Sequence, residues 1–323
     1  MSSILSKKHL PFFATVLVFV AIFLIGGSLY KNFLSTRVLG NILADNSFVI
    51  IAAIGATFVI LSGGIDLSIG SMIGFVGVSM AVLDSMGWNP LATALLMLVF
   101  GFVFGASQGW LIDALDMQPF IITLAGLFLL RGACFMVTVN SVPITHDWAD
   151  LYSSVKIGLP GKGVLRSAAL VMLASLAVAI FIANFTRFGA RVYAIGGDKE
   201  SARLMGVDIR RTTVLVYGLA GFYSALAGVV YALYTKSGYP LAGSTLELSA
   251  IAAVVLGGTL LTGGVGTVAG TLFGGMILGL ISTLIIFNGS LNSAWIMISS
   301  GVLLFAFIAM QRLLVGSFDL GGK

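Results

Sequence analysis

Charged residues are scarce in this chain. Only 9% of its 323 residues are Asp, Glu, Lys or Arg, whereas 59% are hydrophobic. A soluble globular domain carries roughly a quarter charged residues, so this chain cannot cover a water-facing surface. Its apolar runs are long and continuous rather than alternating, which excludes a barrel of membrane strands. The composition therefore predicts an all-α polytopic membrane protein that lies in a lipid bilayer.

Cysteine and histidine are almost absent. The single Cys134 cannot form an intrachain disulfide, and His9 and His146 are the only histidines. These residues form no Cys/His cluster of the kind that binds a metal. No Ser/His/Asp set lies at helical spacing within the apolar runs. We therefore expect neither a metal site nor a catalytic residue, and we expect that the chain is not an enzyme.

A phosphate-binding loop is also missing. No G-x-x-x-x-G-K-[ST] pattern occurs, and GVGTVA at 264–269 satisfies only a loose dinucleotide pattern between two apolar runs, after no strand. We therefore expect no cofactor in this chain. Its formal charge of +5 does not indicate a nucleic-acid partner, because basic residues of a membrane protein gather on its cytoplasmic side.

Long apolar runs make up most of the sequence. A helix crosses the ~30 Å hydrocarbon core with about 20 residues, and on that rule we expect about ten transmembrane helices in a single domain, 1–323. The expected ranges are 10–30, 46–61, 67–86, 91–113, 119–139, 164–185, 212–234, 245–261, 267–287 and 292–312.

The basic residues predict the orientation. Segment 186–211 carries six Lys and Arg residues, and Lys7 and Lys8 lie on the same side when ten helices are counted. Since basic residues favour the cytoplasmic side, we expect this segment and both chain termini to be cytoplasmic. Segment 139–163 is then periplasmic, and we expect it to hold a short helix capped by Asp147.

A short helix is predicted within the cytoplasmic segment, at GDKESARLMG (197–206). Asp198 is a good N-cap, Glu200 suits the positive end of the helix dipole, and Gly206 suits the C′ position. A helix of about two turns is marginal alone in water, so it must dock on a partner; an ordinary charged loop with an incidental cap is the alternative. The expected exposed apolar knob and its adjacent arginine are Ala202, Leu204, Met205 and Arg203.

Glycine pairs interrupt two of the apolar runs. The run from 48 to 83 would span about 54 Å as one helix, so it must break, and LSGGIDLSIG (61–70) contains the place. LLTGGVGTVAG (260–270) repeats the pattern later in the chain. Such a pair of glycine-interrupted helices is the best pointer from sequence to the substrate path of a transporter. The expected residues of the path and its gate are Ser62, Gly63, Gly64, Asp66, Gln108, Gly263 and Gly264.

Few polar residues are expected at membrane depth, where each is a functional candidate. We interpret Asp66 as a cap for the helix after the break, with a substrate contact as the alternative. Arg131 either pairs with Asp66 or a backbone carbonyl, or contacts substrate. Gln108 faces a polar path or bonds a neighbour, and Glu247 completes an S-x-x-E capping box for the helix that it opens.

Four segments carry a resemblance to a known family: VILSGGIDLSIGS (59–71), PFIITLAGLFLLRG (119–132), TRFGARVYAIGGDKESARLMGVD (186–208) and AIAAVVLGGTLLTGGVGTVAGTLFG (250–274). In order and spacing they resemble the membrane permease subunit of bacterial sugar ABC importers of the ribose/galactose class. They look most like the galactofuranose branch of that class. Asp198 stands where the wider family usually has Asn, and both residues are good N-caps.

The resemblance implies a permease subunit that forms the path for a monosaccharide across the bacterial inner membrane. It also implies a second permease, either a copy of this chain or a homologue, a cytoplasmic ATPase that binds ATP and Mg²⁺, and a periplasmic sugar-binding protein. Segment 197–206 would be the coupling helix that sits in a groove of the ATPase. A self-contained, ion-coupled secondary transporter is the alternative, although such proteins hold ion ligands near mid-membrane and this chain offers few.

Overall fold

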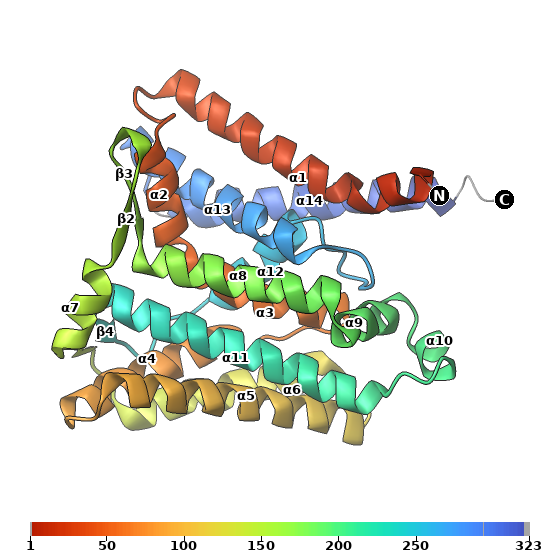
Figure 1. Ribbon diagram of the computed structural model, residues 1–323, viewed down its shortest axis with the longest axis horizontal. Coiled ribbons are helices and arrows are strands. Elements are labelled where there is room, and N and C mark those ends of the chain that lie inside the picture. The colour runs from red at the N-terminus through yellow and green to blue at the C-terminus, as the bar shows by residue number, and fades with distance from the viewer. Residues whose placement is uncertain (1, 293, 320–323) are drawn as a thin grey trace.

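Helices dominate the chain (Figure 1). The computed structural model describes residues 2–292 and 294–319, and the side chains of 12–292 and 294–309. The helices are α1 (Ser2–Leu29), α2 (Thr36–Asp45), α3 (Ser47–Leu61), α4 (Ile69–Ser85), α5 (Pro90–Ala114), α6 (Pro119–Val137), α7 (Asp147–Ser154), α8 (Ser167–Phe185), α9 (Arg187–Gly197), α10 (Lys199–Leu204), α11 (Ile209–Thr235), α12 (Leu246–Leu256), α13 (Val268–Asn288) and α14 (Ala294–Asp319). The strands are β1 (Val142–Pro143), β2 (Lys156–Leu159), β3 (Gly163–Arg166) and β4 (Ser237–Gly238), with a 3₁₀ turn, η1 (Pro160–Lys162), between β2 and β3.

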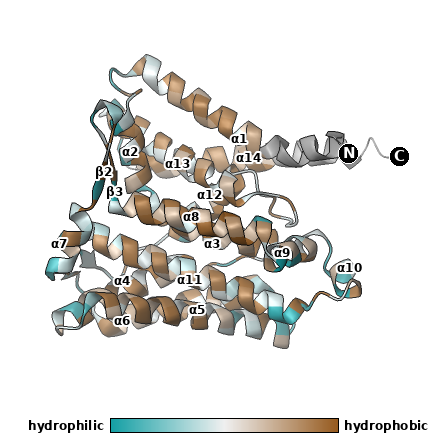
Figure 2. Cartoon of the chain, in the orientation of Figure 1, coloured by the Kyte–Doolittle hydropathy of each residue, from teal (hydrophilic) through white to brown (hydrophobic). Residues whose placement is uncertain are grey.

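The number of full membrane spans is smaller than expected. Within the described residues, α1, α5, α6, α8, α11 and α13 are long and apolar enough to cross a membrane, and α2 with α3, bent by 59°, would make a seventh span. Figure 2 shows hydrophobic residues along these helices. The expectation of about ten full spans is not confirmed, because α4 and α12 have only 17 and 11 residues and the described apolar part of α14 is also short.

The short helices α3 and α4 lie at the centre of the bundle. Every residue of α3 except Phe48 is buried, and α3 packs against α11, α12, α13 and α8. α4 is enclosed by α11, α6 and α5. A short helix with irregular chain at its end is tolerated at membrane depth where protein covers it, which explains how α3 and α4 can be shorter than a full span.

Small residues allow α5 to pack closely along α11. A Cβ at Gly109 of α5 would lie 2.9 Å from the Thr213 carbonyl oxygen and 2.9 Å from the Val214 Cα. Gly101 and Gly105 face the same helix. Close backbone approach is the usual role of small residues between membrane helices, and these three glycines fill that role between α5 and α11.

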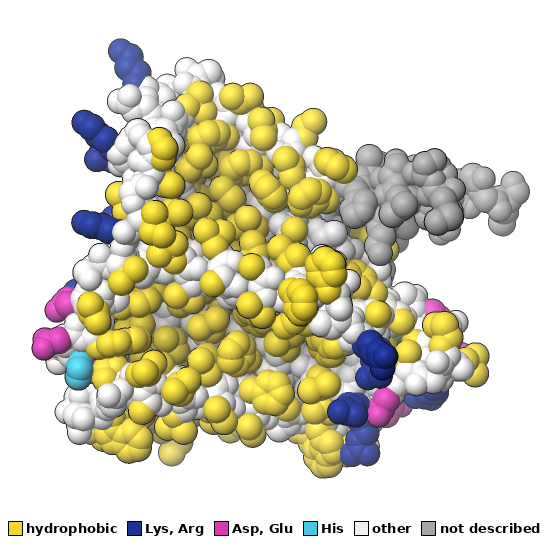
Figure 3. Space-filling view, in the orientation of Figure 1, with side chains coloured by type: hydrophobic (Ala, Val, Ile, Leu, Met, Phe, Trp, Pro, Cys, Tyr) yellow, Lys and Arg dark blue, Asp and Glu magenta, His cyan; other side chains and the backbone are white. Residues whose placement is uncertain are grey.

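Charged side chains gather at the two ends of the bundle, and hydrophobic side chains cover the flank between them (Figure 3). We term these ends the α7 end, which carries α7 and the β2–β3 hairpin, and the α10 end, which carries α9 and α10 (Figure 1). This distribution is the one expected of a protein whose flank lies in lipid.

Segment 139–163 forms more structure than the sequence predicted. The predicted short helix is present as α7, but its cap is His146, whose Nδ1 accepts a hydrogen bond from the Trp148 N–H at 3.1 Å, so the assignment of the cap to Asp147 is wrong. The β2–β3 hairpin was not predicted. It takes up the first residues of the expected helix 164–185, and α8 therefore begins at Ser167.

Candidate functional site

The two glycine breaks contact each other at the α10 end. The Gly264 N–H donates a hydrogen bond to the Leu61 carbonyl oxygen at 2.9 Å, and a Cβ at Gly263 would lie 3.0 Å from the Gly63 Cα. Gly63, Gly263 and Gly264 have φ angles of 83°, 88° and 72°, a region that glycine enters without steric cost. The loop between α3 and α4 and the loop between α12 and α13 therefore form one unit.

Ser62 and Gly64 complete the end of α3. The Ser62 hydroxyl donates to the Val59 carbonyl oxygen at 2.8 Å, and the Gly64 N–H donates to the same oxygen at 2.9 Å. These bonds satisfy a carbonyl that the end of the helix leaves without a partner. Both residues line a hollow of about 200 Å³ that also includes Asp113, Lys199 and Tyr217.

A buried polar cluster follows the first break. Asp66 Oδ1 accepts hydrogen bonds from the Ser68 N–H at 2.8 Å and from the Ser68 hydroxyl at 2.7 Å. The Ser68 Oγ lies 3.3 Å from Gln108 Oε1. Gln108 is 3% exposed, and its Nε2 has no hydrogen-bond partner among the described residues. The structure therefore brings Asp66 and Gln108 together through Ser68, a residue that the sequence analysis missed.

Asp66 supports the turn into α4 in a different way from the predicted N-cap. Its acceptor oxygen bonds the N–H two residues on, which is the pattern of an Asx turn, and α4 begins later than expected, at Ile69. The hydrogen bonds account for the position of the carboxylate without a substrate.

α9 packs directly on both breaks. A Cβ at Gly196 would overlap the Leu61 carbonyl oxygen and would lie 2.6 Å from the Gly264 nitrogen. The Tyr193 hydroxyl donates a hydrogen bond to the Gly266 carbonyl oxygen at 3.0 Å. The first half of segment 186–211 is thus in contact with the gate residues predicted from sequence, and the sequence analysis did not identify this contact.

The predicted caps of α10 are confirmed. Asp198 Oδ1 accepts a hydrogen bond from the Ser201 N–H at 2.6 Å, and Gly206 has a φ of 81° just after the helix. Hydrogen bonding by the Ser201 side chain and backbone lowers the pKa of the Asp198 carboxyl, so the cap is ionised at neutral pH. Glu200 in the first turn and Arg203 in the last turn complement the helix dipole.

The exposed knob of α10 differs from the prediction in one residue. Ala202 is fully buried against Ile195 and Ile209 and fastens α10 to its own chain, so the prediction that it is exposed is wrong. Leu204 is 89% exposed and Met205 is 71% exposed. In a continuous helix, the spacing of three residues would place Met205 on the same face as Ala202. Met205 follows the last residue of α10, so this spacing does not apply to it.

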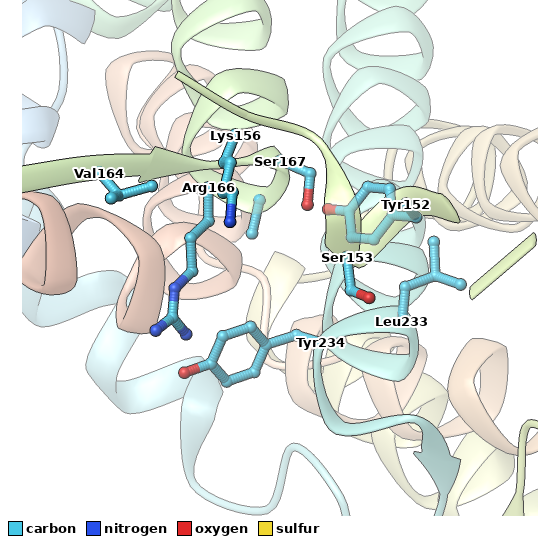
Figure 4. Close-up of a pocket in the computed structure, with 9 residues that line it drawn as sticks. Tyr152, Ser153, Lys156, Val164, Arg166, Ser167, Leu233 and Tyr234 are labelled. Atoms are coloured by element: carbon cyan, nitrogen blue, oxygen red, sulfur yellow. The ribbon is translucent and has the colours of Figure 1, made fainter. Parts of the chain in front are cut away.

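A hollow of about 580 Å³ opens at the α7 end (Figure 4). Lys156 and Arg166, which are register partners in the β2–β3 hairpin, line it together with Tyr152 of α7 and Tyr234 of α11. Burial raises the pKa of Tyr152 to about 12, so its hydroxyl is neutral at physiological pH. The hollow therefore offers two positive charges and neutral hydroxyl groups.

A second hollow, of about 410 Å³, adjoins the first and shares Arg166 with it. It is lined by Arg37, Asn41 and Lys162 in addition. Figure 3 shows Lys and Arg side chains projecting over the hairpin, with acidic side chains over α7. The hairpin side of the α7 end is therefore a basic surface.

Arg131 holds an irregular segment of chain inside the bundle. Its Nη1 donates hydrogen bonds to the carbonyl oxygens of Pro240 at 2.6 Å and Ala242 at 2.8 Å. The prediction that Arg131 pairs with a backbone carbonyl is confirmed. Asp66, the other predicted partner of Arg131, is hydrogen-bonded to Ser68.

The predicted capping box at the start of α12 is wrong. Thr245, at the N-cap, has a φ of 69° and makes no side-chain cap bond, while the Ser244 hydroxyl donates to the Leu241 carbonyl oxygen at 2.8 Å. Glu247 Oε2 is buried without a hydrogen-bond partner among the described residues. Among the described residues of the whole chain, no group of three or more His, Cys, Asp or Glu side chains is placed to hold a metal ion.

Comparison with known proteins finds one matching family and several similar permease proteins. Residues 38–308 match a protein family described as branched-chain amino acid transport system/permease component. The chain is 53% identical over 307 residues to the inner membrane ABC transporter permease protein YjfF of Escherichia coli strain K12, which covers 95% of this chain and 93% of that protein. It is 32% identical over 314 residues to the fructose import permease protein FruG of Bifidobacterium longum, covering 95% and 92%. It is 38% identical over 270 residues to the ribose import permease protein RbsC of Escherichia coli strain K12, covering 83% and 82%. No solved structure matches the chain.

Proposed function

This chain belongs to the branched-chain amino acid transport system/permease component family, in its class of sugar ABC importer permeases, and we propose that it forms the path for a monosaccharide across the bacterial inner membrane. Permease subunits of this kind are not themselves enzymes. Galactofuranose or a related sugar is the proposed cargo, since the segments 62–71 and 120–132 resemble the galactofuranose branch.

The α10 end faces the cytoplasm in this proposal, and the α7 end faces the periplasm. The basic character of segment 186–211 supports this orientation. α1 runs from the α10 end toward the α7 end (Figure 1), which agrees with a cytoplasmic N-terminus; the C-terminus is proposed to lie on the same side. Lys7 and Lys8, which contributed to the prediction, lie outside the residues whose side chains the structure describes.

One observation carries the proposed coupling: α9 contacts both glycine breaks, and α10, which follows it, exposes two large apolar side chains. Leu204 and Met205 would dock in a groove of the partner ATPase, which is the subunit that binds ATP and Mg²⁺. A movement of α10 would then reach the Leu61–Gly264 hydrogen bond through Gly196. A chain without a phosphate-binding loop needs such a contact to use ATP.

The path itself is proposed to lie between this chain and a second permease, either a copy or a homologue. The two breaks would form its cytoplasmic gate, and the cluster of Asp66, Ser68 and Gln108 would lie just inside that gate. At the opposite end, the basic surface around Lys156 and Arg166 would receive acidic side chains of the periplasmic sugar-binding protein.

Sugar uptake by lipid vesicles tests this function. The vesicles hold the complete permease with its ATPase, with ATP on the ATPase side and the sugar-binding protein on the other. We expect uptake to require ATP, the ATPase and the binding protein, and to persist when ion gradients are collapsed. Uptake by the permease without the ATPase, driven by a proton or sodium gradient, would establish the secondary transporter instead.

A further inference from the structure

Between α11 and α12 the chain passes through the bundle without forming a helix. A Cβ at Gly238 would lie 2.8 Å from the carbonyl carbon of Gly77, and a Cβ at Gly243 would lie 3.1 Å from that of Gly70. Segment 236–245 therefore follows α4 for about 10 Å. It reaches a point about 22 Å along α4 from the last residue of that helix at the α7 end, which is deep within the membrane-spanning part of the molecule.

One edge of this irregular segment is exposed. Tyr239 is 42% exposed, Leu241 is 47% exposed, and Leu248, just inside α12, is 58% exposed. Irregular backbone does not face lipid within the hydrocarbon region, because its polar groups would lack partners there. This edge, residues 239–248, therefore borders a water-filled path or another protein chain, and we term it the path edge.

Two charged side chains stand beside the path edge with unused hydrogen-bonding capacity. A guanidinium has five N–H donors, and the hydrogen bonds found for Arg131 use only its Nη1. Glu247 Oε2 is buried and has no partner among the described residues. Among all the residues whose side chains the structure describes, the ion pairs are Arg210–Asp113 and Lys236–Asp150. Arg131 and Glu247 therefore do not neutralise each other by direct contact.

Glycines of α4 make room for both side chains. A Cβ at Gly74 would lie 3.0 Å from Arg131 Nη1, and a Cβ at Gly70 would overlap Glu247 Oε2. Residues four apart lie on one face of a helix, one above the other. The guanidinium and the carboxylate are therefore stacked about one helical turn apart along the same face of α4.

This pair of groups has the chemistry to hold a polyhydroxylated molecule. A hydroxyl group both donates and accepts hydrogen bonds, whereas a guanidinium only donates and an ionised carboxylate only accepts. Adjacent hydroxyls of a sugar can therefore donate to Glu247 and accept from Arg131.

We propose that Arg131 and Glu247 bind hydroxyl groups of the sugar as it moves along the path edge. The proposal rests on the proposed function. It adds a contact point between the periplasmic entrance and the gate formed by the glycine breaks, and it names the sugar hydroxyls as the groups recognised.

Glu247→Gln tests the proposal in the complete transporter in vesicles. The probe is whichever of radiolabelled galactose, ribose, fructose and xylose the wild-type complex imports fastest, together with its analogue lacking one hydroxyl. We expect the variant to import the sugar at least about ten-fold more slowly, the size expected for loss of one charge-assisted hydrogen bond. Its preference for the sugar over the deoxy analogue should fall by a similar factor for one hydroxyl position. ATP hydrolysis stimulated by the loaded binding protein should be retained.

The melting temperature and a neighbouring variant exclude a structural explanation. Because Glu247 Oε2 has no hydrogen-bond partner to lose among the described residues, Glu247→Gln should melt close to the wild-type temperature. Leu248→Ala removes an exposed apolar side chain of the same edge and should retain uptake. If both variants lose uptake and the two permeases dissociate, the path edge is only a subunit interface and the proposal is wrong.

The outcome also separates this proposal from the function on which it rests. If the wild-type complex imports none of the sugars with ATP, both fall. If the wild-type complex imports sugar and Glu247→Gln matches it in rate and in preference, only the proposed contact is overturned.

Discussion

Gly196 is the residue through which α9 touches both glycine breaks, and a methyl group there should uncouple ATP hydrolysis from transport. A Cβ would overlap the Leu61 carbonyl oxygen and would lie 2.6 Å from the Gly264 nitrogen, and since ordinary contact begins at 3.4 Å, α9 and the breaks would have to separate by more than about 0.8 Å. The Leu61–Gly264 hydrogen bond of 2.9 Å lies in the same contact. Overpacking of this kind costs about 1–3 kcal/mol, which changes an equilibrium between two conformations by about 5- to 150-fold.

Gly197→Ala is the matched control for Gly196→Ala. A Cβ at Gly197 would meet no atom within 4 Å, and alanine stabilises a helix relative to glycine by up to about 1 kcal/mol. The assay compares sugar imported with ATP hydrolysed by the complete transporter in vesicles. We expect Gly196→Ala to lower that ratio by at least about ten-fold while its ATPase subunit remains bound and active, and Gly197→Ala to resemble wild type.

Equal ratios for the two variants would refute the reasoning, because they would show that the contact between α9 and the breaks carries no coupling. A melting temperature lowered by Gly196→Ala would be expected from the overpacking. Loss of the bound ATPase would not be expected, because Gly196 belongs to α9 and not to the exposed knob, Leu204 and Met205.

The remaining predictions concern the two ends of the bundle. Asp198→Ala should weaken α10 and lower the ATP hydrolysis that the loaded binding protein stimulates. Because the pKa of Asp198 is lowered from its ordinary value of 3.8, the cap is fully present above that value and is lost only as pH falls through the lower, folded pKa; coupling measured between pH values near neutrality should therefore not change through this group. Arg166→Glu should weaken binding of the sugar-binding protein in a titration, and added salt should reduce the difference from wild type; unchanged affinity would show that the basic surface is not the docking site.

Features set by neighbouring residues were predictable from the sequence. Asp198 and Gly206 cap α10 and Ser62 bonds the end of α3, because each acts on backbone groups within a few residues. The positions of the glycine breaks were also predictable, since an apolar run too long for the bilayer must be interrupted where glycine permits it.

Features set by tertiary packing were not predictable. Ala202 is buried because α9 and α11 cover it, and Glu247 is not in a capping box because Thr245 adopts a left-handed conformation. Gly196 gave no local signal, since its role depends on two loops that meet from distant parts of the chain. Hydropathy also counted α4 and α12 as full spans, because a short helix enclosed by protein is as apolar as one enclosed by lipid.

The central claim is that the ATPase holds α10 and acts through α9 on the glycine breaks. A cross-link from α10 to the ATPase tests it most directly, after the single native cysteine, the buried Cys134, is replaced by alanine. Met205→Cys should form a cross-link whose yield changes when ATP binds, and Ala202→Cys, at a buried position, should form none. Absence of a cross-link from position 205, or a cross-link to the ATPase from Asp147→Cys at the α7 end, would contradict the account.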